Sequence, residues 1–245
     1  QMCIRDRSKP QFDRAVAQLD DEIPTLSDVD IILGMDRIVA LAGDAHTLTD
    51  LEPQRDSPGF RSYPVYLQWF SDGLYVTYTT PDYQWLLGAR VLRIGDLDAE
   101  QAHAAVSALI SHENDQWARA WSPSFLATPE VLQDLGIVTD AENAPFTFLE
   151  ADGAEATLDL APLSHGQKAH WISATDARQI AAPLYRADAY ASYWWQYLPA
   201  SRRLYVEYNS FTEMDDEPSG DFAKEVLDEI KTAPVDRVII DLRNN

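Results

Sequence analysis

The residues best suited to chemistry lie in the short segment "GDAHT", which places His46 close to Asp44 and Thr47 after a predicted helix. Both neighbours carry side chains that can orient an imidazole and fix its tautomer. Histidine titrates near neutral pH, so a histidine held in this way can act as a general base. A loop histidine also serves structural roles, and these five residues alone do not separate the two.

A second polar group closes the sequence, where "VIIDLRNN" passes from an apolar run to charged and amide residues. Asp241 and Arg243 flank Leu242, so on a strand their side chains point to one face. We expect them to pair with each other and to support the loop that follows. Asn244 and Asn245 then serve as turn formers rather than catalytic groups.

The motifs of several other enzyme classes are missing from the sequence. It contains no Gly-x-Ser-x-Gly elbow, no His-Glu-x-x-His, no P-loop and no Gly-x-Gly-x-x-Gly. His165 and His170 share one predicted loop, and His112 precedes Glu113, but neither spacing supplies a third metal ligand. We therefore predict no metal site and no cofactor.

Hydrophobic periodicity indicates the elements that position these residues. Two helices are predicted, over residues 10–23 and 27–43, and the second delivers "GDAHT" into a loop. Aromatic and β-branched runs over 63–70 and 74–80 predict a hairpin that turns at Ser71-Asp72-Gly73. A strand over 89–94, a helix from Asp98, two shorter helices and a hairpin turning at Asp152-Gly153 follow.

A new unit is predicted beyond the aperiodic stretch of residues 161–175. Strand patterns cover 192–198 and 203–209, an amphipathic helix covers 219–233, and a strongly apolar strand covers 235–242. A strand, a helix and a buried strand in succession are typical of a parallel crossover. Functional residues of such sheets gather at the carboxyl ends of the strands, which is where the last polar group falls.

Composition excludes several classes of partner. The 245 residues include 40 Asp and Glu against 19 Lys and Arg, giving a formal net charge of -21. Long-range repulsion makes nucleic acid an unfavourable partner. No stretch approaches the roughly 18 to 20 apolar residues that span a bilayer. The opening "QMCIRDRS" has no helical or strand period and resembles translated adapter sequence, so residues 1–8, with the only cysteine, are set apart from the fold.

Taken in order, four segments resemble the tail-specific, or C-terminal-processing, family of serine peptidases, which includes the tricorn-type core. The four are the helical prelude ending in "DAHT", "LLGARVLRIGDLDAEQA", "RLYVEYNSF" before a helix, and "VIIDLRNN". The second is similar to a stretch of the family's PDZ-like domain, and the last to its Asp-Leu-Arg-x-Asn strand end. The resemblance covers nearly the whole chain from Pro10.

The resemblance implies an α+β protein with an N-terminal helical segment, a PDZ-like β-rich domain and the start of an α/β crotonase-like (ClpP/crotonase) peptidase core. The corresponding ranges are 9–58, 59–162 with a helical insertion, and 163–245. In that family the oxyanion glycines and the serine nucleophile follow the strand end. The resemblance thus implies that residues 1–245 are the N-terminal part of a peptidase and are inactive alone.

The resemblance also implies roles for individual residues. His46 matches the general base of the tricorn-like branch, with Asp44 and Thr47 as supports, although Ala45 stands where tricorn has a serine. In the tail-specific branch a Ser-Lys dyad acts instead, and its lysine would follow residue 245. The implied substrate is a protein or peptide cleaved near its C-terminus, in the periplasm or outside the cell.

Two alternatives stay open at this stage. The same fold is used by binding proteins that do not cleave, and the PDZ-like segment suggests that a peptide tail adds as a strand to a sheet edge. Seven aromatic residues also alternate along the predicted strands, where they form either a groove for apolar ligands or a half-buried sheet face, and the second is commoner. These are Tyr63, Tyr66, Trp69, Tyr75, Tyr78, Tyr83 and Trp85.

Overall fold

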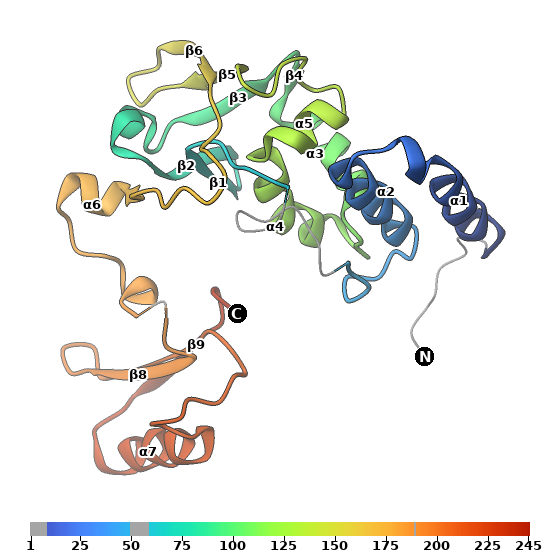
Figure 1. Ribbon diagram of the computed structural model, residues 1–245. Coiled ribbons are helices and arrows are strands. Elements are labelled where there is room, and N and C mark those ends of the chain that lie inside the picture. Colours follow the sequence, from blue (N-terminus) through green and yellow to red (C-terminus); the bar gives the residue numbers. More distant parts are fainter. Residues whose placement is uncertain (1–8, 50–58, 189) are drawn as a thin grey trace. The chain divides into compact units, whose positions relative to one another are not determined.

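The computed structural model describes residues 9–49, 59–188 and 190–245 (Figure 1). They form a mixed α+β protein with an antiparallel sheet and helices, as expected. The chain divides into two compact units, the first ending at Arg178 and the second comprising Gln179–Asn245. Residues 1–8 and the last part of the predicted N-terminal helical segment, 50–58, lie outside the described residues.

The first unit combines a helical pair with a sheet and three covering helices. Its helices are α1 (Lys9–Glu22), α2 (Asp28–Ala40), α3 (Ala99–Val106), α4 (Asp115–Leu126), α5 (Pro129–Asp134) and α6 (Ala174–Arg178). Its strands are β1 (Val65–Phe70), β2 (Gly73–Thr79), β3 (Arg90–Ile94), β4 (Leu97–Asp98), β5 (Ala144–Leu149), β6 (Glu155–Leu160) and β7 (Ile172–Ser173).

The strands of the first unit lie in the order β1-β2-β3-β5-β6, with β4 on β3 and β7 on β2, and all pairs are antiparallel. The predicted hairpin is confirmed, because Phe70 pairs with Gly73 across Ser71-Asp72. The hairpin of β5 and β6 is also confirmed. Within the described residues β1 has β2 as its single strand neighbour.

Helices α3 and α4 pack against β3 and β1 and close the main core (Figure 1). Its largest fully buried side chains are aromatic, and include Tyr63, Phe125, Phe146 and Phe148. The helices begin where the sequence offers capping boxes: Ser27 caps α2, and Asp98 with Gln101 caps α3. These caps fix where each helix starts, and therefore where the loop after α2 leaves the core.

Gly95 makes the turn between β3 and β4 in a conformation that requires glycine. Its φ is +57°, and a Cβ there would lie 1.9 Å from the carbonyl oxygen of Ile137. The Gly95 N–H donates to the carbonyl oxygen of Pro145 at 2.8 Å, which ties this turn to the start of β5. The glycine of this turn is therefore required both by its φ and by its packing.

The second unit is a three-stranded sheet with one long helix. It contains β8 (Tyr193–Leu198), β9 (Arg203–Tyr208), α7 (Ser219–Thr232) and β10 (Arg237–Asp241). Strand β9 pairs antiparallel with β8 and parallel with β10, and α7 makes the connection between the parallel strands. The predicted crossover is confirmed. The core of this unit is formed by Tyr193, Leu204, Val206 and Phe222.

The expectation that β10 is buried is wrong for the described chain. Only Asp241 of this strand is buried, whereas Val238, Ile239 and Ile240 are 36–66% exposed. The reason is position: β10 is an edge strand whose single strand neighbour among the described residues is β9. An apolar composition allows a strand to be buried, but the sequence alone does not show whether another element covers it.

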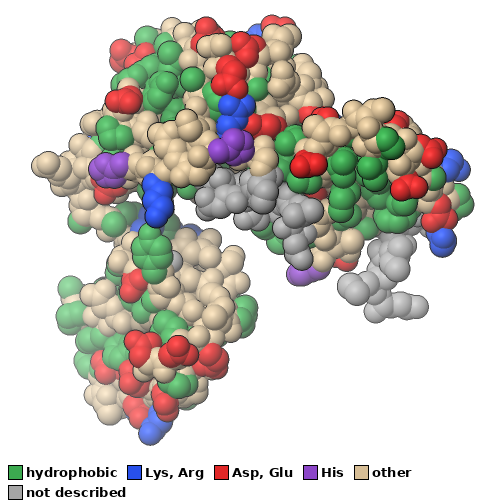
Figure 2. Space-filling view, viewed as in Figure 1, with side chains coloured by type: hydrophobic (Ala, Val, Ile, Leu, Met, Phe, Trp, Pro, Cys, Tyr) green, Lys and Arg blue, Asp and Glu red, His purple; other side chains and the backbone are tan. Residues whose placement is uncertain are grey.

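Acidic side chains are spread over the visible surfaces of both units, with few basic ones between them (Figure 2). This distribution agrees with the formal net charge of -21. Among the described residues, no helix is both long and apolar enough to pass through a bilayer.

Candidate functional site

The loop after α2 holds Asp44, His46 and Thr47 together as one structured turn. The Thr47 hydroxyl donates to Asp44 Oδ2 at 2.8 Å, and the His46 N–H donates to Asp44 Oδ1 at 3.2 Å. These two hydrogen bonds hold the pKa of the Asp44 carboxyl below its ordinary value, and the bond from Thr47 has the larger effect. Asp44 therefore fixes the backbone of the loop, while the imidazole of His46 stays 88% exposed.

A serine from a distant segment pins this loop to the first unit. The Ser111 hydroxyl donates to the carbonyl oxygen of Asp44 at 2.8 Å, and the Asp44 N–H donates back to it at 3.3 Å. On the same side the His46 ring lies 6.2 Å from the ring of Trp117 on α4. The loop thus holds its histidine at the surface with one face toward an aromatic ring.

The second predicted group forms a connected polar cluster at the end of β10. The Arg243 guanidinium donates to both oxygens of Asp241, at 2.9 Å to Oδ1 and 3.0 Å to Oδ2 through Nε. The side-chain hydrogen bonds from Arg243 are the largest of several causes that hold the pKa of Asp241 well below its ordinary range. Arg243 also stacks on the ring of Tyr185, 4.1 Å from its centroid. The predicted pairing of the two charges is therefore present.

The amide residues of this cluster hold the chain after β10 in place. Asn244 donates to the carbonyl oxygen of Tyr185 at 2.8 Å and to Glu207 Oε1 at 3.0 Å. Asn245 donates to the carbonyl oxygen of Tyr208 at 3.2 Å. Both side chains thus tie the chain after β10 to strand β9 and to Tyr185, and their role as turn formers stays a prediction.

Glu207 is a member of this cluster that the sequence analysis did not single out. It is fully buried on β9, beside β10, and its carboxylate contacts the hydroxyl of Tyr205. The same hydroxyl lies 2.7 Å from Asp241 Oδ2, so one phenol links acids on two parallel strands. The pKa of Tyr205 is raised, mainly because the phenol is buried and also because it bonds to these two carboxylates. The sequence did offer a signal for Glu207, because it is an acidic residue within the largely apolar strand "RLYVEY".

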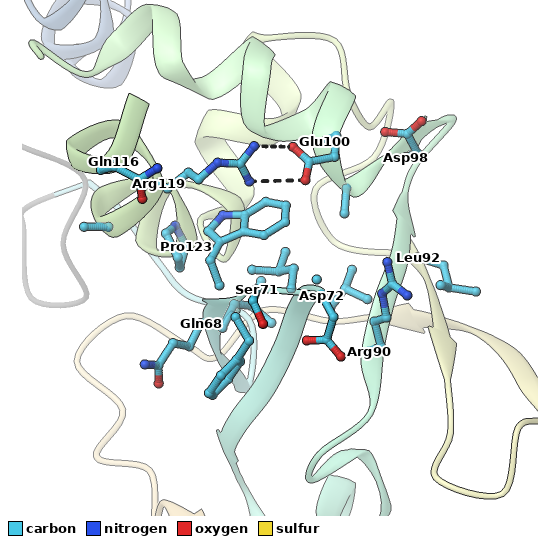
Figure 3. Close-up of a pocket in the computed structure, with 18 residues that line it drawn as sticks. Gln68, Ser71, Asp72, Arg90, Leu92, Asp98, Glu100, Gln116, Arg119 and Pro123 are labelled. Carbon is cyan, nitrogen blue, oxygen red and sulfur yellow. Dashed lines mark hydrogen bonds and ion pairs between the residues drawn. The ribbon is translucent and has the colours of Figure 1, made fainter. Parts of the chain in front are cut away.

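A large groove in the first unit lies beside the end of strand β1 (Figure 3). Its volume is about 1010 Å³, and it is lined by the end of β1, the β1–β2 turn, the start of β3, the start of α3 and one side of α4. The α4 side contributes Gln116, Arg119, Ala120 and Pro123.

Arg119 and Trp69 both line this groove, and Arg119 pairs there with Glu100 (Figure 3). The Arg119 guanidinium lies 4.8 Å from the Trp69 ring centroid and donates to Glu100 Oε2 at 2.7 Å and to Asp115 Oδ2 at 2.8 Å. The two carboxylates, Glu100 first, raise the pKa of Arg119. Arg119 stays charged but is paired with two carboxylates, so it presents a flat, stacked guanidinium rather than an unpaired cation.

The seven aromatic residues do not act as one groove. Tyr63 is fully buried, and its hydroxyl donates to the carbonyl oxygen of Ala141 at 2.9 Å. Trp69 lines the groove beside β1, joined there by Phe70. Tyr66 packs edge-on against Trp171 at 4.6 Å, on a strand face away from the main core, and Trp85 is 46% exposed.

No protein-family model and no curated protein sequence match the chain. Its fold, however, is similar to the folds of two solved structures. The matching structures are of CPAF, the chlamydial protease-like activity factor.

Two CPAF structures match at similar levels. The mature enzyme matches with a TM-score of 0.56 and 11% sequence identity, and mature CPAF complexed with lactacystin with a TM-score of 0.57 and 12% identity. Each match covers 95% of this chain and about half of the CPAF chain, 49% and 50%. Identity at this level establishes similarity of fold alone.

Proposed function

We propose that this chain is the N-terminal part of a serine peptidase of the tail-specific and tricorn-like kind, cleaving proteins near their C-termini. The observation that carries the proposal is the fold similarity to CPAF along 95% of the chain. In this proposal residues 59–162 are PDZ-like and residues 163–245 begin a crotonase-like peptidase core. The nucleophile and the oxyanion glycines follow residue 245, in a protein of the periplasm or the cell exterior.

In the proposed mechanism His46 takes the proton of the serine nucleophile, and an acyl-enzyme forms and is then hydrolysed. Asp44 and Thr47 fix the loop that presents the imidazole, as their hydrogen bonds support. Asp241 and Arg243 brace the end of β10, and Asn244 and Asn245 lead into the oxyanion loop. No cofactor takes part in this chemistry.

A fluorophosphonate probe tests the proposal on a protein that continues past residue 245. We expect the parent to be labelled, the His46→Ala variant to lose labelling, and a His165→Ala control on another exposed loop to keep it. Labelling that survives His46→Ala would assign the proton transfer to another group, such as a downstream lysine. A folded parent that is never labelled would contradict the peptidase.

The groove beside β1 favours a second candidate function, the non-catalytic binding of a peptide or an apolar ligand. The volume of the groove, about 1010 Å³, and the stacked pair of Trp69 and Arg119 support it. Replacing the exposed Ala120 by tryptophan fills the groove without entering the core. Anisotropy of labelled peptides should then show weakened binding, whereas an Ala154→Trp control at a distant hairpin tip should bind as the parent does.

A further inference from the structure

Three side chains that can ligate a metal converge at the loop after α2, from two segments far apart in sequence. Asp44 and His46 belong to that loop, and Glu113 precedes α4. One ligand atom from each lies within 4.8 Å of the other two. Asp44 Oδ1 and His46 Nδ1 are 4.0 Å apart. Small rotations of exposed side chains bring such atoms to the separations found around one bound ion.

The backbone that carries these ligands is held independently of any ion. Ser111, two residues before Glu113, bonds to both the N–H and the carbonyl oxygen of Asp44 and thereby ties the two segments together. The Asp44 carboxylate is oriented by Thr47 and by the His46 N–H. Each carboxylate oxygen has two lone pairs, so these bonds leave acceptor capacity for a cation. Such outer contacts are what orient metal ligands in proteins.

We propose that Asp44, His46 and Glu113 form a binding site for a divalent first-row cation of the Zn²⁺ type. One imidazole nitrogen with two carboxylate oxygens is a donor set that Zn²⁺ accepts, and water completes its coordination at an exposed position. Ca²⁺ and Mg²⁺ prefer sites made of oxygen atoms alone, so the imidazole disfavours them. The spacing along the chain did not indicate this set, because Glu113 lies 67 residues after His46.

Cation binding has a consequence for the loop. A bound ion occupies the lone pair of the His46 imidazole, which is the group proposed above as general base. The site therefore excludes proton transfer by His46 while the cation is present. Binding itself does not rest on the proposed function, because it is measured without turnover.

Isothermal titration with ZnCl₂ tests the site in the 245-residue chain, with Cys3→Ser in every sample to remove the thiol. We expect one saturable site in the parent, and affinity at least about tenfold weaker in His46→Ala and in Glu113→Gln. Matched controls are His165→Ala and Glu155→Gln, which are exposed elsewhere in the first unit and should bind as the parent does.

The outcomes are distinct. A parent without saturable binding, or variants of His46 and Glu113 that bind as tightly as the parent, would overturn the site. Weakening in the two control variants to the same degree would also overturn it, since it would mean diffuse binding to surface groups. Co²⁺ absorption provides a second measurement, because its visible bands should disappear on loss of His46 and not of His165.

Discussion

Asp241 is the single residue on which the end of β10 most depends. Its nearly buried carboxylate accepts hydrogen bonds from Arg243 and lies beside the Tyr205 hydroxyl. These bonds lower its pKa, so the folded state favours the ionised form more strongly than the unfolded chain does. The Arg243 guanidinium shields this charge on the solvent side and stacks on Tyr185.

Asp241→Asn should reduce the free energy of unfolding of the second unit by about 1–3 kcal/mol at pH 7, the range for hydrogen bonds to charged groups. Because the folded pKa is depressed, the carboxylate's contribution is present above the ordinary aspartate value of about 3.9 and is lost as pH falls below it. The difference between parent and variant should therefore shrink between about pH 4 and pH 2. Amide hydrogen exchange in β9 measures it.

Asp236→Asn is the matched control for this prediction. Asp236 also pairs with an arginine, Arg202, at 3.0 Å, but both side chains are more than half exposed. An exposed pair of this kind contributes about 0–1 kcal/mol, so exchange in β9 should change little. Equal effects of the two substitutions would mean that Asp241 is no more than a surface charge.

Local sequence allowed part of each site to be predicted. Asp44, His46 and Thr47 lie within four positions, and the bonds between them follow from that proximity. Asp241 and Arg243 were likewise predicted to pair because strand geometry puts alternate residues on one face. Glu113 and Glu207 were not predicted as members, because their neighbours in space come from distant parts of the chain.

Helix α7 depends on one side chain for its place in the second unit. Phe222 is its single buried residue, and its ring centroid lies 4.6 Å from that of Tyr193 on β8. Val226 packs half-buried against the same core, whereas Leu227 is 54% exposed. The crossover between β9 and β10 therefore relies on a contact made near the start of the helix.

Phe222→Ala should destabilise the second unit by about 3–5 kcal/mol, the usual cost of truncating a buried phenylalanine. Leu227→Ala on the same helix should cost less than about 0.5 kcal/mol, because its side chain is mostly in water already. Hydrogen exchange of β9 amides in both variants gives the comparison. If Leu227→Ala proved as costly as Phe222→Ala, the outer face of α7 would have to be covered in solution.

The helices and strands could largely be predicted from the sequence. Which elements pack against one another could not. Hairpins and capped helices depend on neighbouring residues, so β1–β2, β5–β6 and the start of α2 followed from the sequence. The pairing of β3 with β5 joins segments separated by the helices α3, α4 and α5, and no local pattern specifies it. The apolar run of β10 predicted a buried strand. Such a run shows only that a strand can be buried, and not that another element covers it.

Charge is the property that acts on the whole molecule. The formal net charge of -21 is large, and acidic side chains are visible on both units (Figure 2). Such self-repulsion destabilises a compact state, and added salt reduces it. Some ion pairs oppose this trend, including that of Arg61 with Glu130 at 2.7 Å, which salt weakens.

We expect repulsion to outweigh the ion pairs, because there are 21 more acidic than basic residues and the pairs are few. The thermal midpoint should therefore rise as NaCl increases from about 0.01 to 0.3 M, over which the screening length falls from about 30 Å to below 10 Å. Differential scanning fluorimetry measures this. A variant with Asp21→Asn, Glu155→Gln and Asp228→Asn should depend less on salt, since three exposed charges are removed. A midpoint that falls with salt would instead mean that pairs such as Arg61 with Glu130 dominate the electrostatic free energy of the fold.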